Sequence, residues 1–288
     1  MNYFKILLKV PLVLLENFSF LLFPQLRVVI EKYLYNPLDF KQQHIKYSQN
    51  KFQEFLETIQ PYTSLQEKVL LELGPGGSLG FGILSLEEKL ATYIAIDDGL
   101  HSFIKKNQLA GYRELLGSEN THFSDYFEHR SGQWQYNPQK IKSLIINQES
   151  KYPLEDASVD IIYSCAVLEH VHNLDLCFRE MSRVLKNKGL MYHEVDLRDH
   201  IFSQESLYFL GISDFWFYCL FSKTGAFVNR KRLSYYKDLA TKNNLDILSL
   251  TVTKRYTGLY YPASIQQMSQ EDRDSLVFTI TLKKNAST

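Results

Sequence analysis

Runs of apolar residues without alternation mark the strands that this chain is expected to form. Strands covered on both faces of a sheet have this pattern, and 69–71 is such a run. Further strands are predicted over 91–98, 142–147, 159–164 and 190–195, where polar residues stand among the apolar ones. Apolar residues at three- or four-residue spacing predict helices between and around them, at 40–59, 81–91, 101–116 and 176–185. This alternation predicts a parallel sheet with right-handed crossovers.

The end of the chain continues the pattern. The spacing predicts a helix over 233–243, and two further strands over 246–253 and 276–283. Gly189 follows the helix of 176–185, so we expect it to cap that helix.

Residues 1–39 form an apolar segment that we expect to be a helical extension. Prolines and charged residues interrupt it, and its longest uncharged run is far shorter than the ~20 residues of a spanning helix. Two interpretations stay open. The segment is an interfacial helix on a membrane, with Lys5 and Lys9 near the head groups, or it packs on the domain or a partner. Its thin charged face favours the second.

Residues 40–288 are expected to form one domain with two insertions. The first insertion, 117–140, is polar and aromatic, and a connection of this length is usually functional or disordered. The second, 197–232, is dense in aromatic residues. It is expected to form a small helical subdomain with its own core, or a lid or contact surface.

Composition narrows the classes of function. The chain has 288 residues, of which 45% are hydrophobic, enough for one large domain. Its net charge of zero removes the electrostatic argument for nucleic acid as a partner. Cys165, Cys177 and Cys219 are too few and too widely spaced for a disulfide framework or a zinc site. We therefore expect a reducing, cytoplasmic compartment.

The stretch 69–80 joins a predicted strand to a predicted helix through a glycine-rich turn. Strand, glycine turn and helix in succession is a nucleotide-binding arrangement, because backbone can approach the ligand and N–H groups at the helix start face it. Glu72 comes two positions before Gly74. The dinucleotide fingerprint would require glycine at position 79, where the chain has Leu79. A nicotinamide-dependent oxidoreductase is therefore a weak alternative.

A second acid ends the next predicted strand. Asp97 lies 25 positions after Glu72, near the spacing at which an acid meets a ribose in nucleotide-binding folds. A solvated acid at a strand end is the alternative, which the preceding glycine turn makes less attractive.

These motifs resemble those of the class I S-adenosylmethionine-dependent methyltransferases of the small-molecule group. Residues 69–195 carry the resemblance, with Glu72, Gly74 and Gly76 in the first motif and Asp97 in the second. Ser78 stands where the family has its last glycine. Further on, the stretch 164–171 and the helix that ends in Arg-Val-Leu-Lys-x-x-Gly also match the family.

The resemblance implies a Rossmann-like three-layer sandwich, with a mostly parallel seven-stranded sheet and an antiparallel final strand. It also implies S-adenosylmethionine as the cofactor. Glu72 would anchor the cofactor's ammonium group, Asp97 would accept both ribose hydroxyls, and the backbone of Gln148 or Glu149 would contact the adenine. The implied cofactor-binding residues are Glu72, Gly74, Pro75, Gly76, Asp97, Asp98, Gln148, Glu149, Ser164, Cys165 and Leu168.

A hydroxyl acceptor would benefit from a catalytic base, and histidine suits that role near neutral pH. His170 follows the fourth strand of the predicted sheet and is the first candidate, with a structural histidine as the alternative. His193 and Asp196, at the end of the next strand, are the second. A metal site formed by His193, Asp196, Asp199 and His200 is an alternative. Strand alternation points His193 away from Asp196, and Arg198 between the two aspartates suggests an ion pair instead, so we expect no metal.

We therefore expect an enzyme that methylates a small-molecule, glycan or lipid-type acceptor. A methyltransferase fold that has lost activity and serves as an assembly partner is the alternative. The expected location is cytoplasmic, with peripheral contact at the inner face of a membrane if residues 1–39 lie on lipid.

Overall fold

The computed structural model describes residues 42–97, 104, 106–117, 122–147, 150–200, 207–223 and 227–286, with six isolated positions before residue 24. Most of the predicted extension over 1–39 therefore lies outside the described residues. So do Asp98, Gln148 and Glu149.

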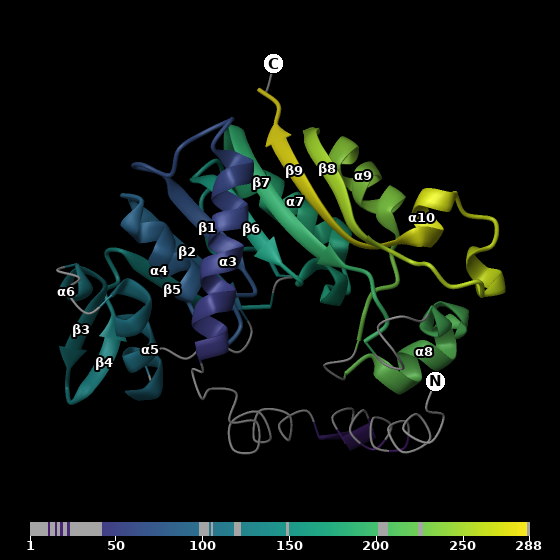
Figure 1. The fold of residues 1–288 in the computed structure, drawn as a ribbon, viewed down its shortest axis with the longest axis horizontal. Coiled ribbons are helices and arrows are strands. Elements are labelled where there is room, and N and C mark those ends of the chain that lie inside the picture. Colours follow the sequence, from purple (N-terminus) through teal and green to yellow (C-terminus); the bar gives the residue numbers. More distant parts are fainter. Residues whose placement is uncertain are drawn as a thin grey trace. The chain divides into compact units, whose positions relative to one another are not determined.

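Strands and helices alternate through most of the described chain, as the pattern of apolar residues predicts (Figure 1). The strands are β1 Val69–Leu73, β2 Thr92–Asp97, β3 Phe127–Arg130, β4 Gln133–Tyr136, β5 Ile141–Ile145, β6 Val159–Cys165, β7 Leu185–Asp196, β8 Leu245–Arg255 and β9 Ser275–Lys284. The helices are α3 Gln42–Ile59, α4 Gly80–Glu87, α5 Lys106–Leu116, α6 Phe123–Tyr126, α7 Leu174–Val184, α8 Asp214–Phe221, α9 Leu233–Lys242 and α10 Gln270–Asp274. Short 3₁₀ turns cover Leu168–His170, Tyr208–Gly211 and Ala263–Ile265.

Seven strands form one sheet in the order β5-β2-β1-β6-β7-β9-β8. The pairs β1–β2, β1–β6, β2–β5 and β6–β7 are parallel. The last strand, β9, runs antiparallel to β7. Leu197, just after β7, donates its N–H to Leu276 at the start of β9, whereas Lys284 at the end of β9 bonds the carbonyl of Leu185 at the start of β7. This confirms the predicted Rossmann-like fold.

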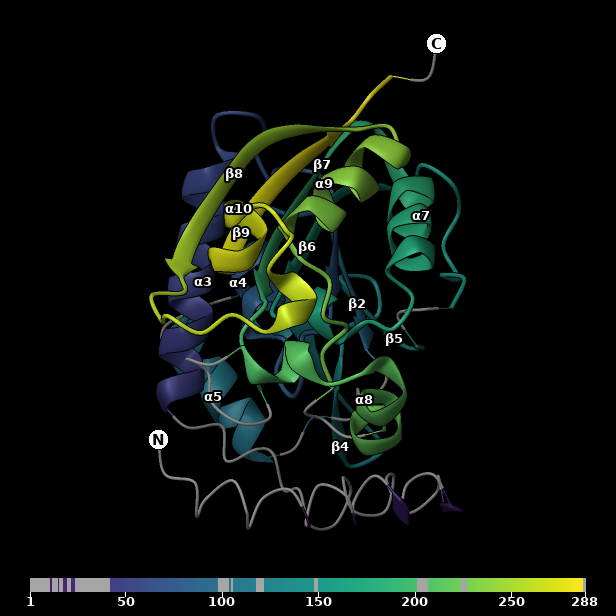
Figure 2. The ribbon, with the colours of Figure 1, turned by 90° about the vertical axis from the view of Figure 1, so that its right-hand side faces the viewer.

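The chain divides into two compact units. The larger comprises residues 37–194, 237–250 and 279–288, and the smaller comprises 1–36, 195–236 and 251–278. In the larger unit, α3 and α4 lie on one face of the sheet and α7 on the other, as Figures 1 and 2 show together. Both faces of the central strands are thus covered, which explains why those strands are apolar without alternation.

The helix α3 packs its apolar stripe on the sheet. Phe52, Phe55 and Ile59 are buried at the spacing expected of one helix face. The ring of Phe55 packs edge-on against Phe81 and Tyr163, with centroids 5.2 and 5.3 Å away. Burial of each such side chain contributes roughly 1.5–3 kcal/mol, so α3 is fixed against the strands that carry the glycine turn.

The helix α7 has one buried face and a side-chain cap at its start. Asn173 accepts a hydrogen bond from the N–H of Leu176 at 3.0 Å. The prediction that Gly189 caps this helix is wrong. The helix ends at Val184, and β7 begins at the next residue. Gly189 lies inside β7, beside a register shift between β6 and β7, where glycine is common in bulged strands.

The insertion 117–140 contains a short hairpin, formed by β3 and β4, that the sequence pattern did not reveal. It packs on α5, where the rings of Tyr112 and Phe127 stack with centroids 5.4 Å apart. Tyr112 also shares a hydrogen bond of 3.0 Å with Tyr136 of β4. The aromatic residues of the insertion therefore hold the hairpin in place.

The smaller unit has its own apolar core. Phe209, Phe217 and Phe221 are buried in it, whereas Phe215 and Trp216 of α8 are exposed. Some aromatic side chains of 197–232 thus pack in this core, and others are exposed.

Candidate functional site

The glycine turn after β1 requires glycine at two positions for different reasons. Gly74 and Gly76 have positive φ angles of 64° and 66°, which side chains rarely adopt. A Cβ on Gly74 would also lie 2.5 Å from Val167, whereas one on Gly76 would meet nothing within 4 Å. The N–H of Gly76 donates to Asp97 at 3.1 Å. The turn is therefore tied to the end of β2, with open space over Gly76.

The first amides of α4 are already hydrogen-bonded within the protein. Gly80 donates its N–H to the hydroxyl of Ser78 at 3.1 Å, and Leu79 donates to the phenol of Tyr112 at 3.0 Å. Ser78, which departs from the family's glycine, thus satisfies an orphan donor at the helix start. These two N–H groups therefore already have acceptors within the protein.

Glu72 lies buried on β1, where it accepts a hydrogen bond from the phenol of Tyr93 on β2. Burial raises the pKa of Glu72 to about 8, and the neighbouring charge of Asp97 acts in the same direction. The hydrogen bond from Tyr93 opposes both effects. Gly82 of α4 makes room for the phenol ring, because a Cβ there would lie 2.1 Å from Tyr93.

A cavity of about 240 Å³ lies beside the glycine turn. It brings together three of the predicted residues, Glu72 on β1 and Gly74 and Pro75 in the turn after it, with Cys165 at the end of β6. The helix α3 contributes residues that sequence reasoning did not find. The full lining is Tyr47, Ser48, Lys51, Glu72, Gly74, Pro75, Gly77, Ser78, Phe81, Tyr163 and Cys165.

The α3 residues at the cavity are joined to the strand ends. Lys51 forms an ion pair of 2.7 Å with Glu194 of β7. Burial acts to lower the pKa of Lys51, but its hydrogen bonds to Glu194 and Glu54 raise it above the usual value. Tyr47 shares a hydrogen bond of 3.2 Å with Cys165. Burial and the charge of Glu194 raise the pKa of the Cys165 thiol to about 12, so this thiol stays protonated.

No local signal marks Lys51 or Tyr47 as site residues, because each is one polar residue on a helix whose pattern identifies only the buried face. Strand alternation does place Glu194 on the opposite face of β7 from His193. This alternation is the signal in the sequence that could have identified Glu194.

Ser164 and His193 form a buried pair. The hydroxyl of Ser164 lies 2.8 Å from Nδ1 of His193, and both side chains are fully buried. Burial lowers the pKa of His193 to about 3, so the imidazole is neutral. This environment suits a structural histidine that orders the end of β6. It does not suit a base that must reach an acceptor.

Asp196 is held by neighbours on its own segment. Arg198 donates to it at 2.8 Å, and His200 lies 3.6 Å away. Burial acts to raise the pKa of Asp196, but the hydrogen bonds from His200 and Arg198 hold it below the usual range. The expected ion pair with Arg198 is confirmed. In the parts of the chain that the structure describes, no group of three or more His, Cys, Asp or Glu residues is arranged to hold a metal ion.

Two predicted residues lie in the turn after β6. Leu168 is buried, whereas His170 is half-buried at the end of the 3₁₀ turn, its N–H bonded to the carbonyl of Val167 at 2.9 Å. Asp98, Gln148 and Glu149 lie outside the described residues, so their roles stay predictions.

Comparison with known proteins finds a family match for part of the chain. Residues 71–193 match a family described as a methyltransferase domain. No curated protein matches the chain in sequence. Among solved structures, an S-adenosylmethionine-dependent methyltransferase from Methanosarcina mazei is 16% identical, with a TM-score of 0.47, and covers 80% of this chain and 98% of its own. One from Mesorhizobium loti is 11% identical, with a TM-score of 0.46, and covers 79% and 96%.

Residues 71–193, less than half of the chain, match the methyltransferase-domain family. This match agrees with the resemblance of the sequence motifs to the S-adenosylmethionine-dependent methyltransferases, which implies S-adenosylmethionine as the cofactor.

The residues at the turn fit that cofactor. S-adenosylmethionine has a sulfonium and an ammonium group, and two acids, Glu72 and Asp97, end neighbouring strands here. Their carboxyl groups are close enough for the charge on Asp97 to raise the pKa of Glu72. The open space over Gly76 leaves room for a ligand against the backbone.

Proposed function

We propose that the chain is an active methyltransferase whose acceptor is a small-molecule, glycan or lipid-type compound. One observation carries the proposal. Glu72, the glycine turn and Cys165 line a single cavity at the carboxyl ends of β1 and β6. Ligands of open α/β sheets bind at that edge.

When bound, S-adenosylmethionine supplies a methyl group that its sulfonium already activates. The protein then mainly has to orient the acceptor and exclude water. Tyr47 and Lys51 of α3 line the cavity together with the turn residues. The Lys51–Glu194 ion pair fixes α3 to the strand ends. In this proposal α3 closes the reaction space, which favours a small acceptor group over a folded macromolecule.

His170 is our proposed base for a hydroxyl acceptor. Its competitors are poorly suited, because His193 is buried and neutral and Asp196 is paired with Arg198. Once an acceptor is known, His170→Gln should lower kcat more than KM and flatten the pH–rate profile. Unchanged kinetics would remove His170 from catalysis.

The proposal is tested by incubating the full chain with methyl-labelled S-adenosylmethionine and a cell extract. The extract is then separated into protein, nucleic acid, polysaccharide, lipid and water-soluble small molecules. We expect label in one of the last three fractions, and no transfer by the Asp97→Ala variant. Label confined to protein or nucleic acid would refute the proposed acceptor class. No transfer at all, with the cofactor bound, would favour the inactive assembly partner.

We also propose that the N-terminal segment contacts a lipid surface. Leu15, Phe18 and Leu22 are helical positions at a spacing that gives one helix face, and their exposed fractions are 66%, 52% and 71%. Lys5 and Lys9 precede them in the sequence and would favour anionic head groups. In the described residues, no helix is long and apolar enough to cross a membrane.

Co-sedimentation with vesicles of phosphatidylcholine, with and without anionic phosphatidylglycerol, tests this contact. We expect binding that increases with the anionic lipid and is lost in Leu15→Asn/Phe18→Asn/Leu22→Asn. The control variant Leu259→Asn removes an almost fully exposed leucine elsewhere and should bind as the parent does. Equal sedimentation of both variants would refute the contact.

A further inference from the structure

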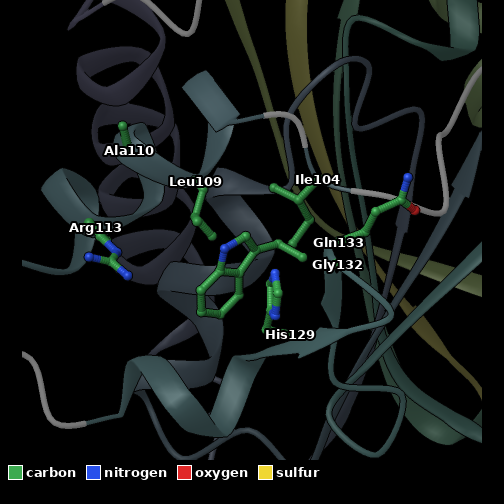
Figure 3. Close-up of a pocket in the computed structure, with 8 residues that line it drawn as sticks. Ile104, Leu109, Ala110, Arg113, His129, Gly132 and Gln133 are labelled. Atoms are coloured by element: carbon green, nitrogen blue, oxygen red, sulfur yellow. The ribbon is translucent and has the colours of Figure 1, made fainter.

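A second cavity is larger than the one beside the glycine turn. It has a volume of about 580 Å³ and lies between α5 and the β3–β4 hairpin (Figure 3). Pockets for small ligands typically have volumes of about 300–1,000 Å³. Its lining residues are Ile104, Leu109, Ala110, Arg113, His129, Gly132, Gln133 and Trp134.

Its polar lining consists mainly of donors without protein partners. Within the described residues, the Arg113 guanidinium pairs with no carboxylate. The indole N–H of Trp134, the ring nitrogens of His129 and the side-chain amide of Gln133 make no hydrogen bond there either. Among the described residues of the lining none is acidic, and the hairpin's Glu128 is already paired with Arg130 at 2.7 Å. The cavity is therefore suited to an anion.

Aromatic contacts hold the key side chains in position. The guanidinium of Arg113 lies over the ring of Phe123, 4.7 Å from its centroid, and Phe123 packs edge-on against Trp134 at 5.9 Å. His129, the cross-strand neighbour of Trp134, packs against the indole at 5.2 Å. A site whose groups are already ordered loses less entropy when a ligand binds.

The rest of the wall is apolar. Figure 3 shows Ile104 and Leu109 on the same side of the cavity, Arg113 projecting from α5, and His129 rising from the hairpin. A small inorganic anion would leave this wall and the indole uncovered. A planar ring would cover them, and its anionic group would reach the guanidinium, which binds carboxylates through two parallel hydrogen bonds.

The cavity is separate from the one beside the glycine turn, because no described residue lines both. The helix α5 lies between them. Its Leu109 and Arg113 face the large cavity, whereas Gln108 donates to the carbonyl of Gly77 at 2.8 Å and Tyr112 accepts from Leu79 of the glycine turn.

We propose that the cavity between α5 and the β3–β4 hairpin is a second binding site, for a planar aromatic carboxylate. The ring lies against Trp134 and the aliphatic wall, and the carboxylate pairs with Arg113. This site binds its ligand whether or not the chain transfers methyl groups, so its test is independent of the proposed function.

The chain has two tryptophans, Trp134 and Trp216. In Trp216→Phe protein labelled with ¹⁵N-tryptophan, the single indole N–H signal in an NMR spectrum therefore reports on the cavity alone. Titration with 2-naphthoate should shift this signal in a saturable manner. The uncharged 2-naphthamide should bind about tenfold more weakly or worse, because it lacks the charge for Arg113.

Arg113→Gln, in the same Trp216→Phe background, should weaken 2-naphthoate binding by about tenfold or more. Arg179→Gln removes an exposed arginine of α7 that lines neither cavity and should leave binding unchanged. Arg113→Lys keeps the charge without the planar fork and should lie between the two. An unchanged urea midpoint would show that each variant remains folded.

Saturating S-adenosylmethionine should not displace 2-naphthoate. Displacement would overturn the proposal, because the probe would then occupy the cofactor pocket. No saturable shift of the Trp134 signal, equal binding of 2-naphthamide, equal affinity in Arg113→Gln, or the same response to inorganic phosphate alone would each overturn it as well.

Discussion

Tyr93 on β2 donates a hydrogen bond to the buried carboxyl group of Glu72 on the neighbouring strand β1. The contact depends on a third residue, since only a glycine at position 82 leaves space for the phenol ring. Burial nevertheless raises the pKa of Glu72 to about 8. The acid proposed to anchor the cofactor is therefore mainly protonated at neutral pH until a cation binds beside it.

The first prediction concerns stability and pH. Glu72 binds a proton more tightly in the folded chain, because its pKa is about 8 instead of the ordinary 4.5, so the free energy of unfolding falls as pH rises through that interval. His193 acts oppositely, because its pKa falls from 6.5 to about 3. The effect of His193 is therefore that the free energy of unfolding increases as pH rises from 3 to 6.5. The two effects oppose each other between pH 4.5 and 6.5, and only that of Glu72 continues from 6.5 to 8.

Urea unfolding at a series of pH values checks this. Above pH 6.5 the wild-type free energy of unfolding should fall by up to about 1.4 kcal/mol per pH unit. Glu72→Gln should lose this decline and keep the rise below pH 6.5. A wild-type decline that persists in Glu72→Gln would show that another group causes it.

The second prediction follows from the proposed contact between Glu72 and the cofactor's ammonium group. A nearby cation favours the ionised acid, so cofactor binding should release a proton. Between pH 6 and 7.5 the affinity should rise, by at most about tenfold per pH unit. Calorimetry in phosphate and Tris, which differ in ionisation enthalpy, should give different binding heats. In Glu72→Gln the two buffers should agree, and the same difference there would contradict the contact.

The third prediction separates two glycines of the same region. Gly82→Ala forces a methyl group against Tyr93, so it should cost several kcal/mol of stability. If the phenol ring can move aside, only its hydrogen bond to Glu72 is lost, and the cost should be about 1–3 kcal/mol. Gly76→Ala meets no protein atom but has a positive φ, so it should cost about 1 kcal/mol while weakening cofactor binding strongly. Thermal unfolding and calorimetry measure both quantities. If both variants lost stability equally and bound equally, this distinction would fail.

The sequence predicted the sheet well for a physical reason. Its central strands are covered on both faces, so they are mainly apolar. The stretch 159–164 has four apolar residues beside Asp160 and Ser164, and the structure has β6 there. The hairpin β3–β4 was not found, because each strand has only four residues and exposes polar side chains such as His129 and Gln133. Gly189 was misplaced because a glycine after a helix usually caps it, whereas here β7 follows α7 directly.

Only those residues of the candidate site that lie close together in the sequence were predictable. Glu72, Gly74 and Gly76 occur within five residues, and their spacing carries the motif. The Tyr93–Glu72 and Lys51–Glu194 contacts join segments 21 and 143 positions apart. No pattern in a single sequence encodes such pairs, because they depend on how the strands and α3 pack.

The central claim is that this chain binds S-adenosylmethionine at the glycine turn, between the acids that end β1 and β2. Calorimetric titration of the full chain with S-adenosylmethionine tests it most directly, with Asp97→Ala and the exposed control Asp238→Ala beside the wild type. We predict saturable binding to the wild type and to Asp238→Ala, with affinity reduced by about tenfold or more in Asp97→Ala, and no binding of NAD. Absence of heat with S-adenosylmethionine, or an unchanged affinity in Asp97→Ala, would contradict the account.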